Sequence, residues 1–170
     1  MTRAALGLGA NLGDRATTLQ DAVDALGRAG PGVRVVGVSA IFETAPVGGP
    51  AQPDFYNAVV LVDTDLQADA LLALAHEIEA AAGRVREERW GPRTLDVDVL
   101  AFGDLRSDDT DLTLPHPRAH ERSFVLRPWL DVDPDAVVPG RGPVADLAAA
   151  AEEAGVRRLA EPLLRLPVGR

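Results

Sequence analysis

The stretch that decides the fold is residues 83–102, GRVREERWGPRTLDVDVLAF. Its second half alternates from residue 94 to residue 100, with Asp96 and Asp98 set between apolar residues, and this alternation predicts a strand. Because successive side chains of a strand point to opposite faces, we expect both carboxylates on one face, about 7 Å apart along the strand. Two carboxylates at that spacing can bind Mg²⁺, which prefers a few carboxylates, retained water and phosphate oxygens.

Four arginines come before this strand, at Arg84, Arg86, Arg89 and Arg93, with Trp90 among them. The guanidinium fork donates two parallel hydrogen bonds to a phosphate, which suits arginine to phosphate binding. Taken alone, an arginine-rich loop or a pair of strand carboxylates is also typical of a solvated surface. Their occurrence together favours a site for phosphoryl-type transfer, which requires charge neutralisation and positioning.

The composition is that of an acidic globular protein. The chain has 170 residues, 46% hydrophobic and 25% charged, which suggests one domain with a substantial core. The net charge of −9 disfavours nucleic acid and anionic membranes as partners, and the absence of cysteine excludes disulfides and thiolate metal sites. No apolar run has the length of a membrane span, and the N-terminus lacks the features of a signal peptide. We therefore expect a cytoplasmic protein, and we also expect a monomer.

The order of predicted elements is strand, helix, strand, strand, helix, strand, which is the pattern of a ferredoxin-like α+β domain. We expect an antiparallel sheet with two helices packed on one face, leaving the other face and its loops for ligand. The elements are strands at residues 3–8, 33–42, 58–62 and 94–100, a helix at 16–28, and a helix that begins at 64–66 and ends before Gly83. We expect a single domain over residues 1–170, with the core motifs in 1–139 and additions in 140–170. These additions comprise a helix at 145–154 and a tail that forms either an added edge or a loose end.

The glycine-rich segment GLGANLG, residues 7–13, follows the first strand. It lacks the Lys-Ser/Thr pair of a P-loop and the glycine spacing of a dinucleotide-binding fingerprint. We interpret it as a tight turn from Gly9 onward, with Asp14 near the N-cap of the first helix.

A long loop rich in proline and glycine, residues 43–54, joins the second and third strands. Loops of this length in compact domains are usually functional or disordered. Phe55 and Asn57 follow it and offer an aromatic face and an amide, which suit a flat heteroaromatic ring. The alternative is that Phe55 and Tyr56 only pin the loop to the core.

A second polar cluster surrounds His116, which lies between two prolines that restrict its backbone. A lone histidine is usually structural, but Arg118, His120 and Arg122 nearby make His116 a candidate phosphate contact. Phe124 follows this basic group and is a candidate second ring of a stacking pair.

The run RWGPRTLDVDVL resembles the signature of the 6-hydroxymethyl-7,8-dihydropterin pyrophosphokinase family of folate-pathway enzymes. Three more segments resemble family segments, in the family's order: GLGANLGDR, ETAPVGGPAQPDFYNAVV and LPHPRAHERSFVLRPWLDVDP. Together they reach almost to residue 139. The resemblance implies transfer of pyrophosphate from ATP to the hydroxymethyl group of a reduced pterin, with release of AMP and with two Mg²⁺ ions as cofactors.

The resemblance also implies roles for individual residues. Catalysis is implied for loop arginines and strand acids, of which the two acids also bind metal: Arg84, Arg86, Arg93, Asp96 and Asp98. ATP binding is implied for residues of the same loop and of the later cluster: Arg86, Trp90, Arg93, Thr113, His116 and Arg122. Pterin binding is implied for two stacking rings, an amide and nearby backbone groups: Thr44, Pro46, Val47, Phe55, Asn57 and Phe124. Glu79 matches an acidic residue that lines the site.

Some positions depart from the family pattern, and two other functions stay open. Phe55 stands where many members have tyrosine, Asp111 stands where some have a basic nucleotide contact, and the arginine loop is one residue shorter than in some members. One alternative is a Mg²⁺–nucleotide transferase with a different acceptor. The other is a non-catalytic ferredoxin-like module that binds nucleic acid, against which the net charge argues.

Overall fold

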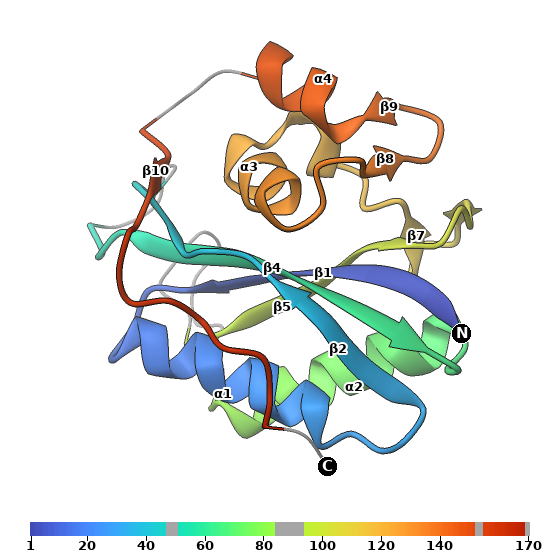
Figure 1. Ribbon diagram of the computed structural model, residues 1–170, viewed down its shortest axis with the longest axis horizontal. Coiled ribbons are helices and arrows are strands. Elements are labelled where there is room, and N and C mark those ends of the chain that lie inside the picture. Colours follow the sequence, from blue (N-terminus) through green and yellow to red (C-terminus); the bar gives the residue numbers. More distant parts are fainter. Residues whose placement is uncertain (47–50, 84–93, 152–154, 169–170) are drawn as a thin grey trace.

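The computed structural model describes residues 1–46, 51–83, 94–151 and 155–168. Within these ranges, a six-stranded antiparallel sheet lies between two layers of helices (Figure 1). Its strands are β1 (Thr2–Ala10), β2 (Val33–Val38), β3 (Phe42–Thr44), β4 (Phe55–Thr64), β5 (Asp96–Phe102) and β10 (Arg157–Arg158). Two small hairpins are formed by β6 (Ser107–Asp108) with β7 (Thr113–Leu114), and by β8 (Val137–Val138) with β9 (Gly142–Pro143). The helices are α1 (Arg15–Gly27), α2 (Ala68–Ala81), the 3₁₀ turn η1 (Ala119–Glu121), α3 (Ser123–Val132) and α4 (Val144–Ala150).

The topology confirms the ferredoxin-like prediction. The strands are ordered β10-β3-β4-β1-β5, with β2 pairing with β4 beside β3, and every pairing is antiparallel. The helices α1 and α2 lie side by side on one face of the sheet (Figure 1). None of the helices in the described ranges combines the length and apolar character that crossing a bilayer requires.

The predicted strand at residues 33–42 is interrupted, and β2 and β3 are separate strands. The interruption coincides with Ser39, whose hydroxyl accepts the N–H of Val59 at 2.9 Å. The N–H of the next residue, Ala40, donates to the carboxylate of Asp131 in α3 at 2.9 Å. Side chains therefore replace part of the backbone ladder at this point.

Helical spacing of apolar residues explains how α1 packs on the sheet. Leu19, Val23 and Leu26 are fully buried against a core that includes Leu6 of β1. The predicted N-cap of α1 is confirmed, because the Asp14 carboxylate accepts the N–H of Thr17 at 3.1 Å. Such caps satisfy backbone donors that the first turn leaves without helical partners.

The opposite face of the sheet, which we expected to stay open, is partly covered by α3 and α4 (Figure 1). Leu126 and Trp129 of α3 pack with Ala5 of β1 and Val59 of β4 in a second apolar core. The cover ends beyond Ala5, since Gly9 on the same face of β1 is partly exposed. The open part of this face is therefore limited to one end of the sheet.

The tail, whose course the sequence left open, forms an added edge in its described part. Its strand β10 pairs with β3, and Leu159 N–H donates to the carbonyl of Ile41 at 2.8 Å. Further along, Gln20 of α1 exchanges two hydrogen bonds with the backbone of Arg165, at 2.8 and 3.0 Å. Residues 159–168 therefore run from the sheet edge to α1, as the red trace in Figure 1 shows.

Candidate active site

The two acids lie on one face of β5, as predicted. The intervening Val97 is buried in the core under α1 and α2, so Asp96 and Asp98 point to the opposite face. Asp96 is partly exposed and Asp98 is exposed. Across the sheet, Asp96 pairs with Gly9 of β1 and Asp98 pairs with Gly7. Both carboxylates therefore border the part of this face that α3 and α4 leave open.

A polar pair on β3 and β4 lies at the same end of the sheet. Asn57 pairs directly with Gly9, so Asn57, Gly9 and Asp96 form one row across β4, β1 and β5. Asn57 is 7% exposed and its amide nitrogen donates to the hydroxyl of Thr44, which is 5% exposed, at 2.9 Å. This hydrogen bond fixes the orientation of the amide.

The two aromatic residues that start β4 point to opposite faces. The ring of Tyr56 lies 3.9 Å below the guanidinium of Arg15, on the side of α1. Phe55 is partly exposed on the same face as Asn57. Tyr56 therefore packs on the α1 side of the sheet, and the predicted stacking role of Phe55 stays a prediction.

Two residues that the sequence analysis missed hold the end of the long loop. The side-chain amide of Asn11, which is buried, donates to the side chain of Gln52 at 2.6 Å and to the carbonyl of Pro53 at 3.2 Å. Arg15 donates to the carbonyl of Asp54 at 2.8 Å. The segment after β1 is thus an anchor for the chain that enters β4. Its signal in the sequence was a polar Asn11 inside an otherwise apolar and glycine-rich run.

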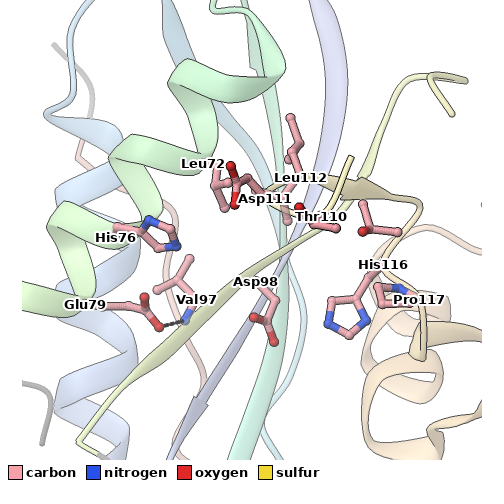
Figure 2. Close-up of a pocket in the computed structure, with 12 residues that line it drawn as sticks. Leu72, His76, Glu79, Val97, Asp98, Thr110, Asp111, Leu112, His116 and Pro117 are labelled. Carbon is pink, nitrogen blue, oxygen red and sulfur yellow. Dashed lines mark hydrogen bonds between the residues drawn. The ribbon is translucent and has the colours of Figure 1, made fainter. Parts of the chain in front are cut away.

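A cavity of about 230 Å³ lies along the edge strand β5, between α2 and the segment that includes β7 (Figure 2). Its walls come from α2, from β5 and from the segment that includes β7, and they comprise Leu72, His76, Glu79, Val97, Asp98, Val99, Thr110, Asp111, Leu112, Thr113, His116 and Pro117. Figure 2 shows Asp98 between the side chains of α2 and the ring of His116. Asp98 thus lines the same cavity as the predicted nucleotide contacts Thr113 and His116. Asp111, which stands where some family members have a basic residue, also lines it.

The surroundings of His116 lower its pKa and so favour the neutral ring. Burial lowers the pKa of His116, the charges of Arg122 and Arg118 lower it further, and the charge of Asp98 opposes them. The backbone N–H of Arg118 donates to Nδ1 at 3.2 Å, so the neutral ring carries its proton on Nε2. His116 can therefore donate one hydrogen bond to an anion in the cavity.

The guanidinium of Arg122 is half-buried, and charged groups of Arg118, Asp98 and Glu121 act on it. Burial lowers the pKa of Arg122, Arg118 lowers it further, and Asp98 and Glu121 raise it. The group stays cationic because arginine titrates far above neutral pH. Its guanidinium carbon lies 5.6 Å from the ring centre of Phe124, in the first turn of α3. Phe124 is partly exposed, and its helix packs on β3 and β4.

Glu79 supports β5 from α2. It is 4% exposed, and its carboxylate accepts the N–H of Val97 at 3.1 Å, drawn as a dashed line in Figure 2. That N–H lies between the two acids in the chain. Glu79 therefore holds the backbone that positions Asp96 and Asp98.

Five predicted site residues lie outside the described ranges: Val47, Arg84, Arg86, Trp90 and Arg93. Pro46, the last described residue before one gap, is partly exposed.

The donor set at β5 fits magnesium. Among the described residues, no group of three or more histidine, cysteine or acidic side chains converges on one point. Mg²⁺ does not require such a group, since it is commonly bound by one or two carboxylates with water and substrate phosphates. Asp96 and Asp98, accessible on one face, meet that requirement.

Comparisons with known proteins agree on one family. The sequence pattern of the family described as 7,8-dihydro-6-hydroxymethylpterin-pyrophosphokinase (HPPK) matches residues 5–134. The 2-amino-4-hydroxy-6-hydroxymethyldihydropteridine pyrophosphokinase of Methylorubrum extorquens is 47% identical over 159 residues, covering 94% of this chain and 99% of the relative. The protein of the same name from Mycobacterium leprae is 46% identical over 174 residues, covering 92% of this chain and 88% of the relative.

The fold is also found among solved structures. The wild-type HPPK-DHPS of Plasmodium falciparum, solved with pteroate, superposes with a TM-score of 0.70 at 13% identity. The match covers 92% of this chain and 47% of that protein, so this chain spans less than half of it.

Proposed function

The chain belongs to the 7,8-dihydro-6-hydroxymethylpterin-pyrophosphokinase family, and from this premise we propose how its own residues carry out the family's transfer of pyrophosphate from ATP to the pterin alcohol. One observation carries the proposal. Asn57, Gly9 and Asp96 form a row across three strands on the open part of one face. A flat acceptor bound at Asn57 would then lie close to Asp96 and Asp98, which would bind the metal ions that contact phosphate.

We assign the acceptor to the side of the row formed by β3 and β4. Phe55 and Phe124 would stack on the two faces of the pterin ring. The amide of Asn57, oriented by Thr44, would read the hydrogen-bonding edge of the ring, together with backbone groups near Pro46 and Val47. The hydrogen bond between Asn57 and Thr44 supports this role because it fixes the amide before ligand binds.

We assign the triphosphate to the side of the row formed by β5. Asp96 and Asp98 would hold two Mg²⁺ ions, which neutralise phosphate charge and polarise phosphoryl oxygens when bound. Thr113, His116 and Arg122 would bind the nucleotide, with His116 donating from Nε2.

Residues of the arginine loop would complete the phosphate site. Arg84, Arg86 and Arg93 would bind phosphate oxygens, and Trp90 would help to exclude water.

In the proposed reaction, the hydroxymethyl oxygen attacks the β-phosphorus of ATP. A bond forms between that oxygen and the β-phosphorus, and the bond from the β-phosphorus to the bridging oxygen of the α-phosphate breaks. AMP leaves, and the alcohol proton passes to solvent. The protein contributes orientation and positive charge, which are the main needs of phosphoryl-type transfer.

We also propose that residues 1–170 form one domain, that the enzyme is a monomer and that it acts in the cytoplasm. The docking of residues 159–168 on the sheet and on α1 supports a single domain. Size-exclusion chromatography with light scattering tests the monomer directly.

The proposed function is tested by AMP formation from ATP and Mg²⁺ with and without 6-hydroxymethyl-7,8-dihydropterin. We expect AMP only when the pterin is present. We expect Asp96→Asn and Asp98→Asn each to lower the rate by about a hundredfold or more, since metal-ion stabilisation of the transition state is typically several kcal/mol. Asp104→Asn, an exposed carboxylate just beyond β5, is the matched control and should keep the activity. Equal rates of AMP formation with and without the pterin would contradict the proposal and favour a transferase with another acceptor.

A further inference from the structure

A cluster of charged side chains connects the C-terminal tail to the two ends of the long loop at residues 43–54. Thr44 of β3 pairs directly with Phe55 of β4, and Glu43 pairs with Tyr56 one step away. Because successive side chains of a strand point to opposite faces, Glu43 and Tyr56 point away from the face that carries the predicted acceptor contacts. The cluster therefore lies behind these contacts, on the side of the sheet that α1 covers.

Glu43 is at the centre of this cluster. Its Oε1 accepts a hydrogen bond from the guanidinium of Arg157 in β10, and its Oε2 lies 3.9 Å from Nη1 of Arg15. The side chain of Glu43 is 18% exposed and that of Arg15 is 25% exposed, against 70% for Arg157. Partial shielding from water strengthens the attraction between Glu43 and Arg15. One carboxylate thus binds an arginine from the tail and another from the start of α1.

Arg15 extends the connection to the other end of the loop. Its Nη1 donates to the backbone carbonyl of Asp54 at 2.8 Å, directly before β4. Its guanidinium carbon lies 3.9 Å from the ring centre of Tyr56, and this stacking orients the guanidinium. The loop begins at Glu43 and ends at Asp54, so Arg15 and Glu43 together hold both of its ends.

Other contacts hold the backbone on either side of Arg157, at the sheet edge where Figure 1 shows β10. Arg127 of α3 donates to the carbonyl of Val156 at 3.0 Å. Arg158, the next residue of β10, pairs with Asp131 of α3 at 3.2 Å. The docking of the tail therefore does not depend on Arg157 alone, and the charge of Arg157 has a separate effect, on the loop.

We infer that Arg157 is a positioning residue for the proposed reaction, acting through Glu43 and Arg15 on both ends of the loop beside the acceptor site. The inference rests on the proposed function and extends it to the tail, which lies beyond residue 134, the last residue of the family match. With the charge at residue 157 removed, Glu43 would hold Arg15 less firmly. Binding of the acceptor would then have to order the ends of the loop, which lowers the affinity.

Nucleotide binding should not depend on this cluster. The predicted contacts Thr113 and His116 line the cavity along β5, whereas Arg157 lies in β10 beside β3. β5 and β10 stand at the two ends of the strand order, so the width of the sheet separates them. The inference therefore predicts a loss that is confined to the acceptor.

The test compares Arg157→Met with Arg158→Met, two adjacent and exposed arginines that each pair with a carboxylate. The partner of Arg157 is at the start of the loop, whereas the partner of Arg158 is in α3. An exposed ion pair changes an equilibrium by up to about fivefold. We expect Arg157→Met to raise the KM for 6-hydroxymethyl-7,8-dihydropterin by about two- to fivefold, with kcat and the KM for ATP unchanged. Arg157→Lys, which keeps the charge, and Arg158→Met should both stay close to wild type.

A double-mutant cycle tests whether Arg157 acts through Glu43. Glu43→Gln removes the charge that both arginines contact, and it should raise the pterin KM at least as much as Arg157→Met does. Adding Arg157→Met to Glu43→Gln should raise the pterin KM no further, because the carboxylate that connects Arg157 to Arg15 is already absent.

Three results would overturn the inference. The first is a wild-type pterin KM in Arg157→Met, or additive effects in the cycle. The second is an equal rise of the pterin KM in Arg157→Met and Arg158→Met, since both residues would then act only by docking the tail. The third is a lower melting temperature of Arg157→Met with equal losses for pterin and ATP, which would make Arg157 a residue of general stability. Failure of the wild-type protein to form AMP with the pterin would instead refute the proposed function.

Discussion

The hydrogen bond between Asn57 and Thr44 leads to a prediction whose size follows from burial. Thr44→Val removes the hydroxyl that accepts the amide N–H at 2.9 Å and keeps the shape of the side chain. Both residues are more than nine-tenths buried, so water cannot easily replace the lost acceptor. Leaving a buried donor without a partner costs about 1 to 3 kcal/mol.

That cost must appear in one of two measurements. If the amide keeps its orientation, the free energy of unfolding falls, and the melting temperature drops by about 2 to 4 °C for each kcal/mol in a domain of this size. If the amide turns to another partner, pterin affinity falls instead, and 1 to 3 kcal/mol corresponds to about 5- to 150-fold. We expect the two losses together to lie in that range.

Urea unfolding followed by tryptophan fluorescence measures the first quantity, since Trp129 of α3 is buried against the sheet. Calorimetry with pterin, Mg²⁺ and a non-hydrolysable ATP analogue measures the second. Thr44→Ser keeps the hydroxyl and is the matched control. Wild-type stability together with wild-type pterin affinity in Thr44→Val would refute the argument that this bond orients the amide.

Three further predictions concern the support of the site. Glu79→Ala should lower the free energy of unfolding by at least about 1 kcal/mol, because the buried N–H of Val97 loses its acceptor. Glu79→Gln keeps an acceptor and should lower the free energy of unfolding by less, and urea unfolding of the two variants measures the difference. In metal-free protein, NMR titration should give a pKa for His116 below its ordinary value. Asp98→Asn should lower the pKa of His116 further, because it removes the carboxylate that favours the charged ring. An unchanged or higher pKa in that variant would contradict an interaction between Asp98 and His116. A chain shortened to residues 1–155 should melt about 4 to 8 °C lower, because two partly buried leucines of the tail leave the core with a loss of about 2 kcal/mol; an unchanged melting temperature would show that the tail contributes no stability.

Local patterns of the sequence predicted the structural features that depend on residues close together in the chain. The period of two in residues 94–100 predicted that Asp96 and Asp98 share a face, and helical spacing predicted α1 together with its cap at Asp14. The break between β2 and β3 was not predictable in this way. It depends on Asp131, which lies about ninety residues further along the chain and reaches the N–H of Ala40.

The meeting of the site residues depends on strand register, which local patterns do not fix. Asn57 and Asp96 are brought together because both pair with Gly9, and no property of either segment alone reveals that pairing. The turn was predicted to begin at Gly9, whereas β1 continues to Ala10, and this error has a similar origin. Glycine favours turns in a local interpretation, but the alternation with Leu6 and Leu8 already indicated that the strand continued. The face of β4 that Phe55 and Tyr56 each occupy likewise follows from the register of the sheet.

The central claim is that Asp96 and Asp98 hold the metal in the same site that contains Gly9 and Asn57. Mn²⁺ prefers the same oxygen ligands as Mg²⁺ and broadens the NMR signals of nearby nuclei. With Mn²⁺ and a non-hydrolysable ATP analogue bound, we predict strong broadening at Gly9 and Asn57 and little at Thr64, which is about 23 Å from Asn57 along β4. Broadening centred elsewhere, or equal at Asn57 and Thr64, would contradict the account.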